Sequence, residues 1–175
     1  KKYANQVVYI PYGADIPPST DPKLLEKYGV EVGKFNLVLA RMEPENHILE
    51  ILEGVRASQY SETTLVIGST KNAFGQKLEG KFRDEKRIRF LQGIYDKNEL
   101  NALRQNARLY FHGHSVGGTN PSLLEAMACS SFIVAHQNAF NKSVLGQHAW
   151  YFLTAEDVAA LINMKENVAK RATRS

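Results

Sequence analysis

Short, mostly apolar runs typical of β-strands alternate along this chain with stretches of helical periodicity. The strand-like runs cover residues 7–10, 35–40, 63–67, 88–91, 107–111, 132–135 and 150–153. Most are apolar without a break, which is typical of strands covered on both faces of a sheet. Helices are expected at about residues 47–58, 71–82 and 96–106, and from Pro121 onward. This alternation predicts right-handed βαβ units, so we expect an α/β fold with a doubly wound, Rossmann-like parallel sheet.

The length of 175 residues suits one domain, and we expect residues 1–175 to form it. Hydrophobic residues make up 43% and charged residues 23%, which excludes a disordered or low-complexity chain. No apolar run approaches the roughly 20 residues that span a bilayer, and no secretion signal is visible. Cys129 is the single cysteine, which excludes an internal disulfide and fits a reducing, cytoplasmic location. Because it lies in an apolar helical run, Cys129 is interpreted as a buried thiol and not as a nucleophile.

The charge is mildly basic, since 22 Lys and Arg residues against 18 Asp and Glu residues give +4 at pH 7. Most basic residues are scattered along the chain. The one mixed cluster, residues 81–89, contains Asp84 and Glu85, which favours a solvated loop over a nucleic-acid-binding stripe. We therefore expect no nucleic-acid partner, because a small anionic ligand explains the charge as well as a polymer does. A basic nucleic-acid binder with steep salt dependence is the competing interpretation.

Polar and glycine-rich segments follow the expected strands, where doubly wound sheets bind ligands at the point of strand-order reversal. The most informative is residues 112–125, in which a strand leads into a glycine-containing loop and then a helix. Free N–H groups at a helix N-terminus attract anions, and Gly117 and Gly118 let a phosphate approach the backbone. Glu125, about one turn into the helix, can accept hydrogen bonds from two ribose hydroxyls. Alternatively, Ser122 and Glu125 form a capping box.

Charged and imidazole side chains at other strand ends add to this pattern. Arg41 ends the second apolar run, where a guanidinium can make a bidentate phosphate contact; the alternative is a surface ion pair with Glu43 or Glu45. His112 and His114 form a His-x-His pair of the kind that can bind zinc. No evident third ligand and no Asp-x-Asp motif accompany this pair, so we expect no metal. We expect instead that one of these histidines donates a hydrogen bond to a phosphate or a sugar.

These features, in this order, resemble the C-terminal, donor-binding domain of GT-B glycosyltransferases, most closely the retaining family 4 (group 1). Residues 8–15 resemble the segment that opens that domain, residues 39–46 its Gly-Arg strand end, and residues 90–95 the loop whose backbone reads the nucleobase. The resemblance implies that the donor diphosphate is bound by Arg41, Asn46, Gly117, Gly118, Thr119 and Asn120. It implies that the ribose is bound by Glu125, the base by Gly93, Ile94 and Tyr95, and the sugar by His112, His114, Ser115 and Ser122. It identifies no catalytic residue in this chain and implies no cofactor and no metal.

Two positions depart from that family's usual pattern. The glutamate that lies eight residues before Glu125 in the family is Gly117 here, and the lysine that lies five residues after Arg41 is Asn46. Residues 112–127 instead resemble a subgroup of rhamnosyltransferases of bacterial surface polysaccharides. That resemblance implies transfer of a sugar from dTDP-L-rhamnose, with retention, to a polysaccharide or lipid-linked acceptor.

The resemblance covers one half of a two-domain enzyme. We therefore expect the N-terminal, acceptor-binding domain to be absent from this chain, and the chain alone to bind nucleotide without transferring sugar. A further expectation is peripheral association of the full-length protein with the inner face of the membrane. Two other functions stay open, namely a sugar-nucleotide epimerase of similar architecture and a non-catalytic nucleotide-sugar-binding module.

Overall fold

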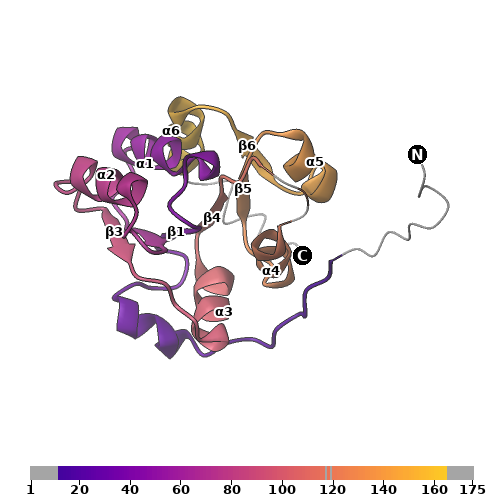
Figure 1. The fold of residues 1–175 in the computed structure, drawn as a ribbon. Helices are drawn as coiled ribbons and strands as arrows, with labels where there is room; N and C mark the ends of the chain where they lie inside the picture. The colour runs from indigo at the N-terminus through magenta and orange to yellow at the C-terminus, as the bar shows by residue number, and fades with distance from the viewer. Residues whose placement is uncertain (1–11, 117, 119, 165–175) are drawn as a thin grey trace, which may run out of the picture.

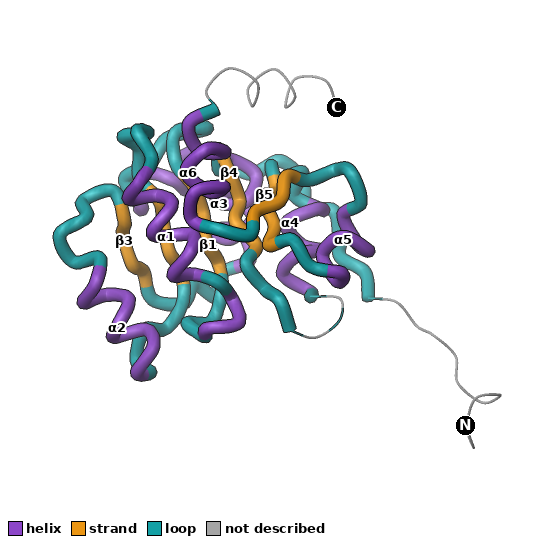
Figure 2. The backbone as a smooth tube through the Cα atoms, turned by 90° about the horizontal axis from the view of Figure 1, so that it is seen from above, coloured by secondary structure: helices purple, strands orange, loops and turns teal. Residues whose placement is uncertain are grey.

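Within the described residues, six strands form one parallel sheet between two layers of helices (Figure 1 and Figure 2). The computed structural model describes residues 12–116, 118 and 120–164. The strands are β1 (Asn36–Leu39), β2 (Thr64–Ile67), β3 (Ile88–Leu91), β4 (Leu109–His112), β5 (Ile133–His136) and β6 (Trp150–Phe152). Their order in the sheet is β3-β2-β1-β4-β5-β6, and every neighbouring pair is parallel. The predicted doubly wound, Rossmann-like α/β domain is confirmed, while the run predicted at residues 7–10 lies outside the described residues.

The connections between strands are helical. The helices are α1 (Ile48–Ala57), α2 (Ala73–Lys81), α3 (Lys97–Asn106), α4 (Pro121–Ala128), α5 (Ala139–Leu145) and α6 (Ala155–Asn163), with the 3-10 helices η1 (Pro22–Tyr28) and η2 (Pro44–Asn46). Asp96 begins α3 as predicted, because its side chain accepts hydrogen bonds from the backbone N–H groups of Asn98 and Glu99. Helices η1, α5 and α6 were not expected. Helix α5 follows β5 closely, and its N-cap is Asn138, whose side chain accepts a hydrogen bond from the N–H of Asn141.

Alternate residues of each strand face two separate cores. Val38 and Phe111 pack with the apolar residues of α1, α2 and α6. Leu37 and Tyr110, one position earlier on the same strands, pack with those of η1, α3 and α4. Removing these side chains from water on both faces holds the three layers together and explains the unbroken apolar runs.

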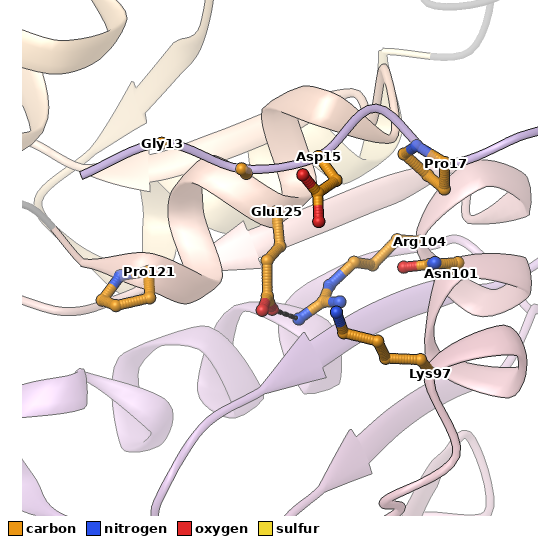
Figure 3. A pocket seen from close by; sticks show the side chains of 9 residues that line it. Gly13, Asp15, Pro17, Lys97, Asn101, Arg104, Pro121 and Glu125 are labelled. Atoms are coloured by element: carbon orange, nitrogen blue, oxygen red, sulfur yellow. Dashed lines mark hydrogen bonds and ion pairs between the residues drawn. The ribbon is translucent and has the colours of Figure 1, made fainter.

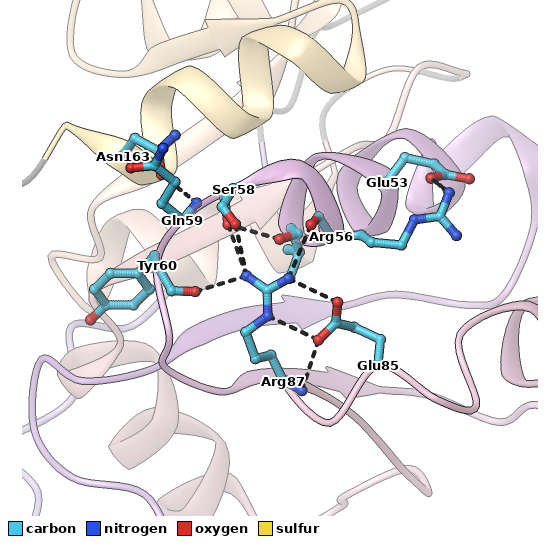
Figure 4. Close-up of polar contacts among 9 residues, drawn as sticks. Glu53, Arg56, Ser58, Gln59, Tyr60, Glu85, Arg87 and Asn163 are labelled. Atoms are coloured by element: carbon cyan, nitrogen blue, oxygen red, sulfur yellow. Dashed lines mark hydrogen bonds and ion pairs between the residues drawn. The ribbon is translucent and has the colours of Figure 1, made fainter.

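The basic cluster that the sequence places before β3 is organised around Arg87 (Figure 4). Its guanidinium donates two hydrogen bonds to the carboxylate of Glu85, at 2.9 and 2.8 Å. It also donates to the backbone oxygens of Ser58 and Tyr60, both at 2.9 Å, and of Arg56, at 3.0 Å. These bonds tie the end of α1 to the start of β3 and hold the pKa of Glu85 below its ordinary value. The cluster is therefore not simply a solvated loop, since its central cation belongs to the fold.

Cys129, directly after α4, is buried as expected, with 4% of its surface exposed. Burial raises the pKa of its thiol, which makes the thiol a weaker nucleophile. None of the helices in the described part of the chain is both long and apolar enough to cross a lipid bilayer.

Candidate functional site

The strand order reverses between β1 and β4, whose carboxyl ends lie side by side. The loops after these two strands therefore meet where doubly wound sheets bind their ligands. They enclose a pocket of about 200 Å³, here called the switch-point pocket. It is lined by Leu39, Ala40, Arg41, Asn46, Phe111, His112, Gly113, His114, Asn120 and Ser122. The fold thus brings together six residues predicted to bind diphosphate or sugar: Arg41, Asn46, His112, His114, Asn120 and Ser122.

Gly113 allows the two loops to approach each other. A Cβ atom at this position would lie 1.8 Å from the backbone oxygen of Asn46, so a larger residue requires the chain to move. Ser115 lies two positions after Gly113 in the same loop. Its backbone N–H and its hydroxyl each donate a hydrogen bond to the backbone oxygen of Glu45, both at 3.0 Å. The same hydroxyl lies 3.0 Å from Nε2 of His47. Ser115, predicted to contact the sugar, does not line the switch-point pocket, and its hydroxyl joins the two loops.

Arg41 lines the pocket with an exposed side chain. Among the described residues, its hydrogen bonds are made by the backbone oxygen, which accepts from Asn46 Nδ2 and from the N–H of Glu43. The alternative ion pair with Glu43 or Glu45 is not formed, and Glu43 accepts a hydrogen bond from Asn72 instead. A guanidinium that has no acceptor among the described residues suits a bidentate contact with a phosphate.

His112 ends β4 and is buried beside the pocket, with 5% of its surface exposed. Burial disfavours the imidazolium and lowers the pKa of His112 to about 4, with a smaller contribution from nearby His114. The ring is therefore neutral at neutral pH. Its Nε2 atom has no hydrogen-bond partner among the described residues. Such a buried, unpaired polar group costs roughly 1–3 kcal/mol, and a ligand in the pocket could complete the contact.

Helix α4 begins beside the pocket. Its N-cap is Asn120, whose side chain accepts a hydrogen bond from the backbone N–H of Ser122 at 2.9 Å. The capping box of Ser122 and Glu125, an alternative left open by the sequence, is therefore not formed. The hydroxyl of Ser122 lies 3.0 Å from that of Tyr110, and Glu125 is ion-paired with Arg104 of α3.

Glu125 lines a second pocket of about 390 Å³, here called the α3–α4 pocket (Figure 3). It is lined by Gly13, Ala14, Asp15, Pro17, Lys97, Asn101, Arg104, Pro121 and Glu125. The side chain of Arg104 is 4% exposed, whereas that of Glu125 is 44% exposed. The buried guanidinium thus holds a carboxylate that a ligand can reach. A carboxylate in this position can accept hydrogen bonds from a pair of hydroxyl groups.

Other predicted site residues lie outside both pockets. Gly93, Ile94 and Tyr95 follow β3, and Tyr95 is 95% exposed with its ring against Gly93. Gly118 is exposed, with open space around it. Gly117 and Thr119, predicted to bind the diphosphate, lie outside the described residues. The roles assigned to these residues stay predictions.

Sequence reasoning missed the polar wall that α3 contributes to the α3–α4 pocket. A signal for Arg104 was present, since it lies four residues after the apolar Leu100 and so shares the same face of the helix. A cation on an inward face requires an acidic partner, and Glu125 provides it. The sequence placed Asp15 only in the segment that resembles the opening of the domain, and it gave Asp15 no role in a site.

The histidines at this edge of the sheet do not assemble a metal site in the part of the chain that the structure describes. No three His, Cys, Asp or Glu side chains there lie close enough together to hold a metal ion. The rings of His47 and His136 are stacked, with centroids 3.8 Å apart, and the centroids of His112 and His114 are 6.0 Å apart. The arrangement offers imidazoles and an exposed guanidinium for hydrogen bonding to a polar, anionic ligand.

A Rossmann-like domain with polar pockets at and beside the switch point is a typical architecture of nucleotide-binding proteins. The family model of glycosyl transferases group 1 matches residues 23–168, and the chain belongs to this family. No curated protein matches the sequence.

Solved structures share this fold. HepE from Anabaena, in complex with UDP-glucose, has a TM-score of 0.79 at 19% identity, over 92% of this chain and 48% of that one. The C-terminal domain of the group 1 protein LpcC from Francisella tularensis has a TM-score of 0.74 at 19% identity, over 91% of both chains. A glycosyltransferase from Rickettsia africae has a TM-score of 0.76 at 16% identity, over 97% of this chain and 51% of that one. At these identities the likeness establishes the fold, and this chain spans about half the length of HepE.

Proposed function

We propose that this chain is the donor-binding domain of a glycosyltransferase and binds a nucleotide-diphospho-sugar across the switch-point and α3–α4 pockets. The observation that carries the proposal is Arg41, an exposed cation whose guanidinium has no partner among the described residues and lies at the carboxyl end of β1. Membership of the group 1 family supports it. HepE, which has this fold, was solved with UDP-glucose bound, and this adds further support.

In this proposal, the diphosphate lies between Arg41 and the N-terminus of α4, where Gly117, Gly118, Thr119 and Asn120 supply backbone groups. Negative charge grows on the diphosphate as its bond to the sugar breaks. A guanidinium fixed in place stabilises that charge without having to reorganise during the reaction. The cation of the protein therefore does the work for which other enzymes use a metal ion, and no cofactor is invoked.

The nucleoside and the sugar are assigned to either side of the diphosphate. Glu125 accepts hydrogen bonds from the ribose hydroxyls, and the loop of Gly93, Ile94 and Tyr95 contacts the base. The sugar meets the histidine-lined part of the switch-point pocket, formed by His112 and His114 together with Ser122.

The finer assignment is to the retaining family 4, with dTDP-L-rhamnose as donor. The resemblance of residues 112–127 to rhamnosyltransferases supports it. A 6-deoxy sugar lacks a hydroxyl, which suits the absence of the usual glutamate at Gly117. We assign the polysaccharide or lipid-linked acceptor to a second domain, since this chain spans about half the length of HepE. Peripheral membrane association of the complete protein follows from a lipid-linked acceptor.

Calorimetric titration with UDP, dTDP and pyrophosphate tests this function. The wild-type chain is expected to bind both nucleotides, and Glu125→Gln is expected to weaken nucleotide binding roughly 10-fold through loss of a charged hydrogen bond. Pyrophosphate binding is expected to be unchanged. Glu26→Gln, at an exposed position of η1, is the matched control. Absence of nucleotide binding by the wild-type chain would contradict the function, and equal losses for nucleotide and pyrophosphate would contradict the ribose contact.

A further inference from the structure

The side-chain amide of Asn46 has a fixed orientation. Asn46 is 4% exposed, and its Nδ2 donates a hydrogen bond to the backbone oxygen of Arg41 at 2.8 Å. A backbone oxygen can only accept, so the amide nitrogen must lie on this side and the amide oxygen on the other. The amide oxygen Oδ1 lies 2.7 Å from Nδ1 of His114. Because an amide oxygen also only accepts, Nδ1 of His114 must carry the hydrogen.

The backbone around His114 is held on two sides, which keeps the ring in register with Asn46. The backbone oxygen of His114 accepts hydrogen bonds from the side-chain amides of Asn138 and Asn141, at 3.1 and 3.0 Å. The preceding residue, Gly113, packs against the backbone of Asn46 with no space for a side chain. The imidazole is therefore presented to the switch-point pocket in one orientation.

A neutral imidazole that carries its hydrogen on Nδ1 has a lone pair on Nε2. That nitrogen has no hydrogen-bond partner among the described residues, and His114 lines the switch-point pocket. Phosphate oxygens only accept hydrogen bonds, so a lone pair on Nε2 does not suit them. A hydroxyl group can donate to it.

We propose that Asn46 is a positioning residue that locks His114 in the Nδ1-protonated tautomer, so that Nε2 accepts a hydrogen bond from a hydroxyl of the donor sugar. This inference rests on the proposed function for its ligand, while the tautomer follows from the hydrogen bonds alone. It assigns Asn46, which the sequence suggested for the diphosphate, to the orientation of a sugar-contacting side chain. The His114 contact then selects for a donor sugar with a hydroxyl in reach.

The first test reads the tautomer directly by nitrogen-15 NMR of the His114 ring at about pH 8. The wild-type chain is expected to show the Nδ1–H tautomer. Asn46→Asp still offers an oxygen to Nδ1 and is expected to keep it. Asn46→Leu removes the acceptor and is expected to shift the population towards Nε2–H. A wild-type ring in the Nε2–H form, or a tautomer that Asn46→Leu leaves unchanged, would overturn the positioning role.

The second test uses two substitutions that each copy one ring nitrogen. The amide of His114→Asn can reach the position of Nδ1 but not that of Nε2, whereas the amide of His114→Gln can reach the position of Nε2. Calorimetry with dTDP-L-rhamnose and with dTDP is expected to show that His114→Asn weakens dTDP-L-rhamnose binding about 3- to 10-fold, the effect of one hydrogen bond, with dTDP binding unchanged. His114→Gln is expected to restore part of the loss. His148→Asn, at an exposed histidine, is the control.

The outcomes separate this inference from the proposed function. Equal weakening of dTDP and dTDP-L-rhamnose binding by His114→Asn, or no weakening of either, would overturn the sugar contact while leaving nucleotide binding in place. A wild-type chain that binds neither compound would overturn the function and the sugar contact together. In that case the NMR result still decides whether Asn46 sets the tautomer.

Discussion

Arg87 and Arg41 lie at opposite ends of the sheet's strands and have opposite surroundings. Arg87, just before β3, donates to a carboxylate and to three backbone oxygens, so its charge is used within the fold. Arg41, just after β1, is exposed, and no described residue accepts a hydrogen bond from its guanidinium. The same type of side chain therefore stabilises the fold at the amino edge of the sheet, whereas at the carboxyl edge it is exposed beside a pocket, where we propose that it binds the diphosphate.

Two residues near Arg41 also leave polar groups or space unfilled at the carboxyl edge of the sheet. The buried Nε2 atom of His112 has no hydrogen-bond partner among the described residues. At Gly113, the backbones of two loops lie so close together that there is no space for a side chain. The unpaired nitrogen lowers the stability of the fold, and the close approach at Gly113 restricts that position to glycine. Together these features set the polarity and the shape of the switch-point pocket. Functional sites commonly carry such local costs, because the surrounding fold supplies the stability.

The largest expected effect comes from filling the space at Gly113. Gly113→Ala places a methyl group 1.8 Å from a backbone oxygen, which cannot rotate away as a side chain could. We expect the free energy of unfolding to fall by about 3 kcal/mol or more, because the two loops must separate. Urea denaturation measures this loss.

The matched control is Gly80→Ala, at a position of α2 where an added Cβ meets open space. This change is expected to raise stability by up to about 1 kcal/mol, because alanine has the higher helix propensity. If the two variants had equal stability, the carboxyl edge would not be as tightly constrained as the comparison requires.

The next effect concerns the pH dependence of stability. The pKa of His112 is lowered to about 4 in the fold, against about 6.5 when unfolded, so the unfolded state takes up a proton first as the pH falls. Unfolding should therefore become easier between about pH 6.5 and pH 4, by roughly 3 kcal/mol from this residue. The lowered pKa of His136 acts in the same direction and is retained in a His112 variant.

Urea titrations between neutral pH and about pH 4 compare the wild-type chain with His112→Leu. The variant is expected to have a flatter pH profile, since the buried group that resists protonation is gone. His148→Leu, at an exposed position, should keep the wild-type profile. Identical pH profiles for the wild-type chain and His112→Leu would show that protonating the buried His112 ring does not destabilise the fold.

Features governed by local sequence were predictable, and features governed by long-range contacts were not. The strand runs, the cap at Asp96 and the helix start at Pro121 all follow from a few adjacent residues. The same reasoning located Arg41 and His112 at the carboxyl ends of two strands. This reasoning placed such residues along the chain but did not show which side chains contact one another.

Pairs that lie far apart in the sequence needed the folded chain. Asn46 and His114 are separated by 68 positions, and Arg104 and Glu125 by 21. Asn46 looked like a phosphate ligand because its position was compared with a family pattern. In the fold, both ends of its amide are already hydrogen-bonded. Glu125 looked like a cap because its spacing from Ser122 allows one, whereas a buried arginine on another helix holds it.

Calorimetric titration with UDP of the wild-type chain, Arg41→Ala and Arg87→Met tests the contrast between the two edges most directly. Arg41→Ala is expected to weaken UDP binding by roughly 10- to 100-fold, through loss of charged hydrogen bonds, with unchanged stability in urea. Arg87→Met is expected to lose about 2–3 kcal/mol of stability, because Glu85 and several backbone oxygens lose their donor, while its affinity for UDP is unchanged. If Arg41→Ala bound UDP as tightly as the wild-type chain, or if Arg87→Met lost UDP binding while still folded, the carboxyl edge would not be the diphosphate site.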